Sequence, residues 1–475
     1  MTDTDRQDDA GAPSDAPSDA LSVSSTELSR SASSSPAVST PPPPPPAPGR
    51  ADESYETGGL GLFALIALLV ALGVGAGWAW VVIILGVVVM IFLHELGHFV
   101  TAKWSGMKVT EFFIGFGPRI WSFRRGETEY GLKGIPAGAY VRIVGMNNLD
   151  EADPADEPRT YRQQSFPKRL LVVSAGSIMH MVQAFVLLVV LLGVVGVPGG
   201  SLTDDTARQR TWEVGSVVAD SAAGEAGLQE GDRIVTFDGE PVDTWSDVTA
   251  AIQASEVDDD ISLGVERGGE TLTLDAVLGP RPDDQGGDAG SPFLGVGATT
   301  PIQSVGLGEA LVTAPGEMVG FMGDAVGAMV GFFSPDGLGD FAGNVTRADD
   351  QATPAPSGSG SSQQVSSDDG SENRMISIYG AVRMGAELSE DGWMWVLLMF
   401  FQINIFIGIL NMFPLPPLDG GHAAVAVYER IRSRRGTRYH ADMAKLLPLT
   451  YAVVLGLVML GVASLYLDIV NPIDI

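Results

Sequence analysis

The sequence contains no cysteine and only five histidines among 475 residues. The absence of cysteine excludes disulfide bonds and thiolate ligands, so a bound metal would have to be held by histidine and carboxylate side chains. Basic residues are also few, because 28 Lys and Arg stand against 58 Asp and Glu and give a net charge of −30. Such a charge argues against nucleic acid as a partner, since a polyanion is bound through clusters of positive charge.

Charge of either sign is missing between Glu56 and Glu95. One membrane-spanning helix needs about 20 residues, so the apolar stretch 59–102 is too long for a single span. Glycines at 73–77, followed by two tryptophans, indicate a turn at a membrane interface. One very long tilted helix is the alternative. The start of the chain lacks the basic residues of a cleavable signal peptide, so we expect both predicted spans to be retained, at about 60–76 and 79–102.

The most informative pattern is His94-Glu-Leu-Gly-His98, at the end of that apolar stretch. On a helix, side chains four residues apart project from one face, so both imidazoles can bind the same metal ion. Glu95 is then close enough to take a proton from a metal-bound water. Two packed core histidines are the alternative, but ionisable groups at membrane depth are costly and are functional by default. The pattern predicts a metalloprotease that cuts peptide bonds inside the bilayer.

Composition separates two polar segments and one amphipathic segment from the apolar runs. Residues 1–58, rich in Ser, Asp, Ala and Pro, cannot bury enough apolar area to fold, which predicts a disordered tail. Residues 335–374, rich in Gly, Ser, Asp and Gln, are expected to be a disordered insertion. Residues 304–333 are apolar with acidic residues on one helical stripe, which predicts an amphipathic helix lying on the bilayer.

Strand patterns and further apolar runs complete the predicted organisation. Short strand-like stretches punctuated by glycine indicate a β-loop at 107–145 and a compact domain at 211–280. Three more runs have the length and apolar composition of spans, at 170–197, 393–412 and 447–467. The predicted membrane core therefore has an N-terminal half at 59–200 and a C-terminal half at 376–475.

The basic residues gather in two loops. Residues 103–169 and 413–446 hold 17 of the 28 Lys and Arg, whereas 198–392 carries 34 acidic and 8 basic residues. Positive charge marks the cytoplasmic side of a membrane protein, so both basic loops are predicted to be cytoplasmic and the acidic section to lie outside. With five spans, this arrangement places the N-terminus in the cytoplasm.

Two motifs together resemble the site-2 protease family of intramembrane zinc metalloproteases: His94-Glu-Leu-Gly-His98 in an early span and Asn411-x-x-Pro-x-Pro-x-Leu-Asp419-Gly in a late one. The resemblance implies that His94, His98 and Asp419 bind Zn²⁺ and that Glu95 is the catalytic base. Two imidazoles and one carboxylate leave the fourth zinc position open, as a catalytic site requires. A turn residue is the alternative for Asp419, because Asp-Gly is a common turn pair.

The same resemblance implies the architecture. It predicts a polytopic α-helical membrane protein of about five spans, four of them the family core. A membrane-associated β-loop and one extracytoplasmic PDZ-like α+β domain would complete it, and the segment 60–76 would be additional to the core. The overall sequence looks most similar to actinobacterial members, which regulate sigma-factor signalling.

The sequence departs from the family pattern in one place. Many members carry Gly-Pro-x-x-Asn where this chain has Gly176-Ser-Ile-Met-His180. We expect His180 to donate a hydrogen bond in the place of that Asn, which is thought to contact the substrate or the reaction intermediate. His180 and Asn411 are therefore predicted to be substrate-binding residues.

The resemblance finally implies partners and location. Substrates would be single-span membrane proteins, such as anti-sigma factors or remnant signal peptides, already shortened outside by an upstream site-1-type protease. The chain would be a multi-pass protein of the plasma membrane, with its active site toward the cytoplasmic side. The alternative is a non-catalytic membrane scaffold or transporter whose PDZ-like domain recruits partners.

Overall fold

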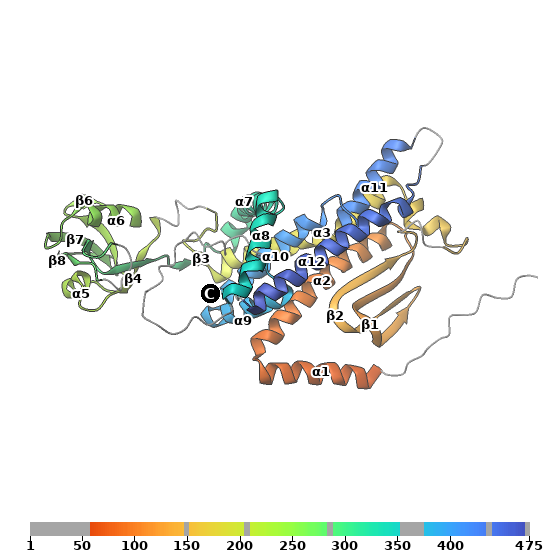
Figure 1. Cartoon of the computed structure of the whole chain (residues 1–475), viewed down its shortest axis with the longest axis horizontal. Coiled ribbons are helices and arrows are strands. Elements are labelled where there is room, and N and C mark those ends of the chain that lie inside the picture. The colour runs from red at the N-terminus through yellow and green to blue at the C-terminus, as the bar shows by residue number, and fades with distance from the viewer. Residues whose placement is uncertain are drawn as a thin grey trace, which may run out of the picture. The chain divides into compact units, whose positions relative to one another are not determined.

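The computed structural model describes residues 58–146, 152–203, 210–282, 288–351, 375–433 and 439–470 (Figure 1). The predicted N-terminal tail lies outside the described residues except at its last position. Among the described residues, four helical segments are long and apolar enough to cross a membrane. They are α2 (Trp78–Trp104), α3 (Phe166–Val190) with the π-helical η3 (Leu191–Val195), α10 (Trp393–Asn411), and α12 (Leu447–Val470) with the preceding turn η4 (Met443–Leu446). These segments correspond to the four predicted core spans.

The predicted first span differs from the other four. Helix α1 (Gly58–Gly75) ends where expected, because Gly77 has a φ of 103° and separates α1 from α2. Its apolar part, Gly61–Gly75, is shorter than a membrane span. The N-terminal end of α1 lies against the β-loop, where an added Cβ on Gly61 would be 2.8 Å from the Ile120 side chain. The two-helix interpretation of 59–102 is confirmed, but α1 is not among the candidate spans.

The β-loop is an antiparallel sheet made of two long, bent strands, β1 (Val109–Arg125) and β2 (Thr128–Ile143). The first half of β1 pairs on both sides, so that Phe112 lies opposite Val141 and also opposite Tyr130. Residues 139–143 therefore form one edge of the sheet. At the turn between the strands, hydrogen bonds from Arg159 and Lys103 lower the pKa of Glu127 to about 2. Those ion pairs tie the sheet to the end of α2.

Helix α3 is packed on several sides by other helices. It contacts α2, α10, α11 (Asp419–Arg432) and α7 (Leu307–Phe332). Its small and apolar side chains form one core with α7 and α10, in which Ala184, Leu188, Ala310 and Phe401 are fully buried. Such close packing suits a lipid environment, where helices associate by van der Waals contact and not by exclusion of water. Most residues that could form a functional site therefore have α3 as a neighbour.

The segment 304–351 contains more helix than expected. Helix α7 occupies the predicted amphipathic segment, and α8 (Pro335–Gln351) follows it where a disordered insertion was predicted. The prediction rested on composition, which does not record that the apolar residues of α8 recur at helical spacing. One of them, Phe341, is buried against Phe332 and Leu467. Taken together, α7 and α8 are also long and apolar enough to cross a membrane. They are bent by 70° relative to each other, as in a broken span or a re-entrant loop. The rest of the predicted insertion, 352–374, lies outside the described residues.

Another helix escaped the sequence analysis. Helix α9 (Ile378–Asp391) precedes α10 and packs its Val382 against Ile83 of α2 and Met399 of α10. Ser377 caps α9 by accepting a hydrogen bond from the Gly380 amide. Its amphipathic sequence was missed because it lies between a polar stretch and the strongly apolar sequence of α10.

A compact α+β domain has its own apolar core. A four-stranded antiparallel sheet in the order β6-β5-β7-β8 packs with two helices around Val214, Ile234, Leu263 and Leu278. Its elements are β4 (Glu213–Val217), α5 (Ala222–Ala226), β5 (Arg233–Phe237), β6 (Glu240–Pro241), α6 (Trp245–Ala254), β7 (Asp260–Arg267) and β8 (Glu270–Val277), followed by β9 (Gly279–Pro280), β10 (Pro292–Phe293) and β11 (Val296–Thr299). Because β11 pairs with β4, the domain continues to residue 299, beyond the predicted boundary at 280. The chain segments that enter and leave the domain pair with each other, as β3 (Val197–Pro198) with β12 (Ile302–Gln303).

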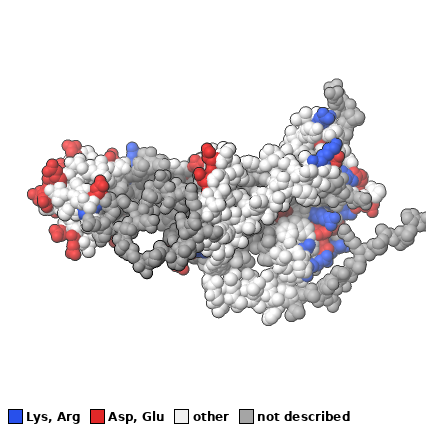
Figure 2. Space-filling view, viewed as in Figure 1, with Lys and Arg blue, Asp and Glu red and all other residues white. Residues whose placement is uncertain are grey.

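Charge is distributed unevenly over the surface. In Figure 2 the acidic side chains gather over the compact domain, and the basic ones gather near the β1–β2 sheet and α11. The visible surface of the helices bears few of either sign. This pattern is the one expected of membrane-spanning helices flanked by polar regions on each side.

One buried carboxylate offers a test of the compact domain. Asp232 is fully buried and accepts hydrogen bonds from Arg267 at 2.7 and 2.6 Å and from the Gln229 amide at 2.8 Å. Burial acts to raise its pKa, but the hydrogen bonds from Arg267 and Gln229 outweigh that effect, and the pKa is lowered from 3.8. A carboxylate with a lowered folded-state pKa stabilises the fold above its unfolded pKa, and this contribution is lost as the pH falls through the folded pKa.

We therefore predict that Asp232→Asn weakens hydrogen-exchange protection of β5 and β7 at pH 7 by about 2 kcal/mol. The difference from wild type should begin to shrink as the pH falls below about 4, where the unfolded carboxylate takes up a proton, and should vanish below the lowered folded-state pKa, where the folded carboxylate is protonated as well. Exchange is measured by mass spectrometry on the full chain in detergent. Asp260→Asn, an exposed position on β7, is the control. Equal protection of wild type and Asp232→Asn at pH 7 would contradict the assignment.

Candidate metal centre

His94 and His98 lie one turn apart on α2, and both are more than nine-tenths buried. His98 Nδ1 donates a hydrogen bond to the Val172 carbonyl of α3 at 2.7 Å. This bond fixes the ring and leaves Nε2 with its lone pair free to bind a cation. His98 Nε2 lies 3.2 Å from His94 Nε2, so the two imidazoles converge on one point.

Asp419 reaches the same point from the C-terminal half of the chain. It is the first residue of α11, and its Oδ2 lies 3.5 Å from His94 Nε2 and 3.2 Å from His98 Nε2. The proline-rich segment before α11 folds back against the next residue, where a Cβ on Gly420 would be 2.2 Å from the Phe413 carbonyl oxygen. Glycine at that position therefore allows the segment to deliver the carboxylate to α2.

These three side chains fit a zinc ion. Tetrahedral zinc with bonds of about 2.0–2.1 Å places its ligand atoms about 3.3 Å from one another. The three separations of 3.2, 3.2 and 3.5 Å match that spacing. Asp419 Oδ2 and His94 Nδ1 are buried and have no hydrogen-bond partner in the described part of the chain. A buried carboxylate oxygen without a donor, placed beside two imidazole nitrogens, is the arrangement that a cation would complete.

A single glycine on α3 makes room for the two imidazoles. A Cβ on Gly176 would lie 2.3 Å from His94 Cε1 and 2.4 Å from His98 Nε2. The two helices also approach closely at Gly97, between the two histidines of α2, where a Cβ would lie 2.7 Å from the Ala175 carbonyl oxygen. The small residues Ala175 and Gly176 of α3 therefore lie against the candidate metal centre.

Glu95 lies beside the edge of the β1–β2 sheet. Its carboxyl group lies near the Val141 backbone, which belongs to the edge segment 139–143. The carboxyl group follows the first candidate ligand directly and is not one of the three converging ligands. The predicted base and the sheet edge 139–143 thus lie on one side of the candidate metal centre.

His180 lies next to the cluster but is held by a residue that the sequence analysis missed. The ring centroids of His180 and His94 are 4.9 Å apart. His180 Nδ1 donates a hydrogen bond of 2.9 Å to Asn404 Oδ1 on α10, and the Asn404 amide in turn donates to the Phe400 carbonyl. Both residues are buried. An asparagine inside an apolar span is costly without a partner, and that signal would have identified Asn404.

The other sequence-predicted residues are placed less closely. Asn411 is the half-buried last residue of α10, on the same helix face as Asn404, seven residues earlier. His422, three residues after Asp419, is not part of the converging group among the described residues. The structure therefore brings together His94, His98 and Asp419, with Glu95 and His180 adjacent.

Two imidazoles and a carboxylate that converge among membrane-length helices, with a glutamate next to the first imidazole, define an intramembrane zinc metalloprotease. The chain belongs to the Peptidase family M50, whose family model matches residues 82–455. It is a multi-pass membrane protein of this site-2 protease family.

Several curated relatives carry the same type of name. The chain is 32% identical over 413 residues to the zinc metalloprotease Rip1 of Mycobacterium bovis, covering 82% of this chain and 96% of that protein. The zinc metalloprotease Rip1 of Mycolicibacterium smegmatis is 32% identical over 416 residues, covering 82% and 97%. A putative zinc metalloprotease of Brucella suis is 28% identical over 362 residues, covering 73% and 84%.

One solved structure is similar to a part of the chain. The PDZ domain of the SdrC-like protein from Listeria monocytogenes matches with a TM-score of 0.17 and 22% identity, covering 19% of this chain and 87% of that structure.

Substitution of Gly176 tests whether α3 shapes the candidate metal centre. We predict that Gly176→Ala lowers zinc affinity by about 10- to 100-fold, the usual range when the surroundings of metal ligands are disturbed, because the added methyl group displaces both imidazoles. Zinc content and affinity are measured on the purified protein by atomic absorption and chelator competition. Gly461→Ala on α12 is the control, since nothing lies within 4 Å of a Cβ at that position. Full zinc affinity in Gly176→Ala would rule out the arrangement.

Proposed function

We propose that the chain is an endopeptidase that cuts transmembrane segments with a zinc ion held by His94, His98 and Asp419. The convergence of their three ligand atoms at 3.2–3.5 Å carries the proposal. A zinc ion bound there would supply Lewis-acid polarisation of the scissile carbonyl and would acidify a water molecule. Glu95 takes the proton from that water on its carboxylate and later delivers it to the leaving amine.

The edge segment 139–143 would hold the substrate. A transmembrane helix must unwind before cleavage, because its carbonyls are engaged in intrahelical hydrogen bonds. An unwound segment can then add to the sheet edge as a further strand through main-chain hydrogen bonds. The proximity of Glu95 to this edge segment favours this placement, since it brings the added strand beside the catalytic base.

His180 and Asn411 are proposed to contact the substrate. Because Asn404 Oδ1 accepts a hydrogen bond from His180 Nδ1, Nε2 of the neutral ring is an acceptor. His180 would therefore receive a backbone N–H of the substrate, in contrast to the donor role expected from the sequence. Asn404 is a positioning residue that sets this tautomer.

The substrates are proposed to be single-span membrane proteins, such as anti-sigma factors or remnant signal peptides. An upstream site-1-type protease would first shorten them outside the cell. The chain is proposed to lie in the plasma membrane with its active site toward the cytoplasm, because the basic loops flank α3 and α11. The acidic, PDZ-like domain would then be extracytoplasmic.

Glu95→Gln tests the mechanism. The variant should keep its zinc and its fold, because Glu95 is not a metal ligand, but should lose cleavage by at least about 10²–10⁴-fold, the contribution of a positioned general base. Cleavage of a single-span substrate is followed in proteoliposomes, with zinc content measured in parallel.

Two controls make this result decisive. Glu309→Gln, an exposed position in the first turn of α7, should cleave as wild type does. His98→Ala should lose both zinc and activity. Near-normal turnover by Glu95→Gln would overturn the mechanism, whereas absence of cleavage by the zinc-loaded wild type would favour the non-catalytic scaffold.

Single cysteines in this cysteine-free chain test the orientation. We predict that Thr271→Cys in the acidic domain reacts with a membrane-impermeant thiol reagent in intact cells, whereas Ala155→Cys in the basic loop reacts only after permeabilisation. Both positions are exposed. Ser25→Cys distinguishes the role of α1, because its protection in intact cells indicates that α1 spans the membrane. Labelling of Ala155→Cys in intact cells would invert the proposed orientation.

A further inference from the structure

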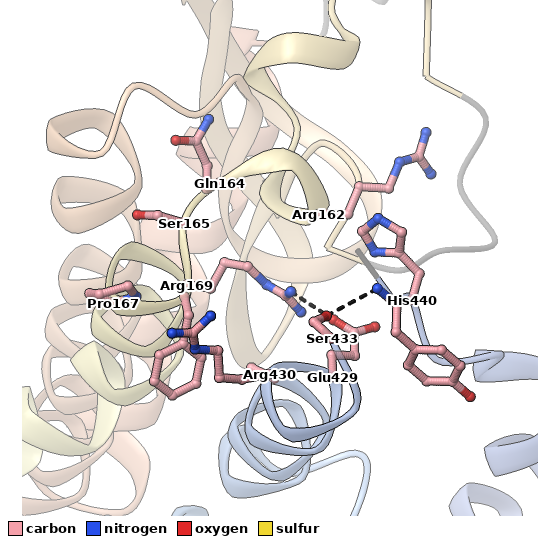
Figure 3. A pocket seen from close by; sticks show the side chains of 12 residues that line it. Arg162, Gln164, Ser165, Pro167, Arg169, Glu429, Arg430, Ser433 and His440 are labelled. Carbon is pink, nitrogen blue, oxygen red and sulfur yellow. Dashed lines mark hydrogen bonds and ion pairs between the residues drawn. The ribbon is translucent and has the colours of Figure 1, made fainter. Parts of the chain in front are cut away.

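A cavity of about 360 Å³ lies where α3 begins, between α3 and α11 (Figure 3). Basic and titratable side chains from three parts of the chain line it: Arg162, Arg169, Arg430 and His440. Among the described residues that line it, Glu429 is the single acid. The cavity is separate from the metal centre and takes no part in the proposed hydrolysis.

The charge of Glu429 is already satisfied. Its Oε2 lies 2.6 Å from Arg169 Nη1 (Figure 3). Its Oε1 accepts a hydrogen bond of 2.6 Å from the Ala441 amide. The Arg169 side chain is also stacked over the Tyr161 ring, 4.8 Å from its centroid. Arg162 is likewise paired, with Glu157. In these two pairs the positive charge of the arginine is neutralised by a glutamate. The uncompensated positive charge at the cavity is therefore that of Arg430, and His440 lines the same cavity.

Two further features indicate that an anion is the expected occupant. Arg430 is exposed and makes no ion pair or hydrogen bond among the described residues, although it lines the cavity. Arg169 is nine-tenths buried, and its Nε has no hydrogen-bond partner in the described part of the chain. The first turn of α3, where Ser165 makes no side-chain cap, adds the positive end of a helix dipole to the same wall.

The size and position of the cavity point to a lipid headgroup. A volume of 360 Å³ is that of roughly a dozen water molecules, which exceeds the need of a small free ion. The cavity lies at the first turn of a candidate membrane span, and the ends of a span are where lipid headgroups are expected. On the neighbouring helix α11, Val427 and Ile431 lie one turn apart and are 40% and 75% exposed, as expected of side chains in contact with acyl chains.

We propose that this cavity binds a phosphate group through Arg430, Arg169 and the first turn of α3. An anionic phospholipid or a free phosphate ion could supply the same chemistry, and the size of the cavity and the apolar surface of α11 favour the lipid. Arg430 is the residue that confers the preference, because its charge is not used within the described part of the protein.

The test compares two arginines on one helix. Arg430 lines the cavity, whereas Arg432, two residues later, stacks over the Tyr428 and Tyr439 rings and does not line it. Native mass spectrometry of the detergent-purified full chain counts retained phosphatidylglycerol against phosphatidylcholine. Equilibrium dialysis of the chain in phosphatidylcholine nanodiscs measures binding of inorganic phosphate. Arg430→Glu and Arg432→Glu are compared in both assays, and zinc content verifies that each variant is folded.

Wild type should retain phosphatidylglycerol in preference to phosphatidylcholine. Arg430→Glu should reduce that preference by about tenfold or more, since it reverses one basic charge that contributes severalfold to anionic-lipid binding. Arg432→Glu should change it by less than about twofold. Binding of inorganic phosphate alone, with the same dependence on Arg430, would support the site and assign it to a free ion. Absence of both ligands, or equal losses in the two variants, would overturn the proposal.

Discussion

The cost of burying polar groups in an apolar bundle governs this structure. Within the membrane-length helices, a polar side chain must find a partner or bind a ligand, because no water is available to satisfy it. His98 uses the Val172 carbonyl, and His180 uses Asn404. Asp419 Oδ2 finds no donor within the described part of the chain. Polar residues are rare in membrane spans because of this cost. A buried carboxylate oxygen without a donor therefore indicates where a cation would bind.

Helix α3 supplies the surroundings of that point without supplying a ligand. It provides the space at Gly176, the carbonyl that orients His98, and the ring of His180. Because metal affinity depends on how firmly ligands are oriented, an element that contributes no ligand can still determine whether the site forms. This explains why a residue as small as Gly176 lies at the centre of the site.

The sequence predicted the site better than it predicted the elements around it. His94 and His98 share a helix face by spacing alone, and the late motif identified Asp419, so their convergence required only that two spans meet. Helix α9 was missed because its amphipathic sequence lies between a polar stretch and a strongly apolar one. Asn404 was missed although a polar residue inside an apolar span is itself a signal. Helix α8 was missed for a different reason, since its polar composition concealed the spacing of Phe341 and its apolar neighbours. The acceptor role proposed for His180 could not be predicted from the sequence, because it depends on the hydrogen bond to Asn404, 224 residues away.

Helix α11 joins the metal centre to the basic edge of the bundle. Its first residue is the candidate ligand Asp419, and its Glu429, nearly three turns later, is paired with Arg169 of α3. Both ends of α11 are therefore fixed to the same partner helix or its immediate neighbour. A buried ion pair contributes little net stability, but removing one partner is costly, so such a pair is better suited to specifying one arrangement than to adding free energy. The Arg169–Glu429 pair accordingly joins α11 to α3 near one end, while Asp419 at the other end meets the two imidazoles.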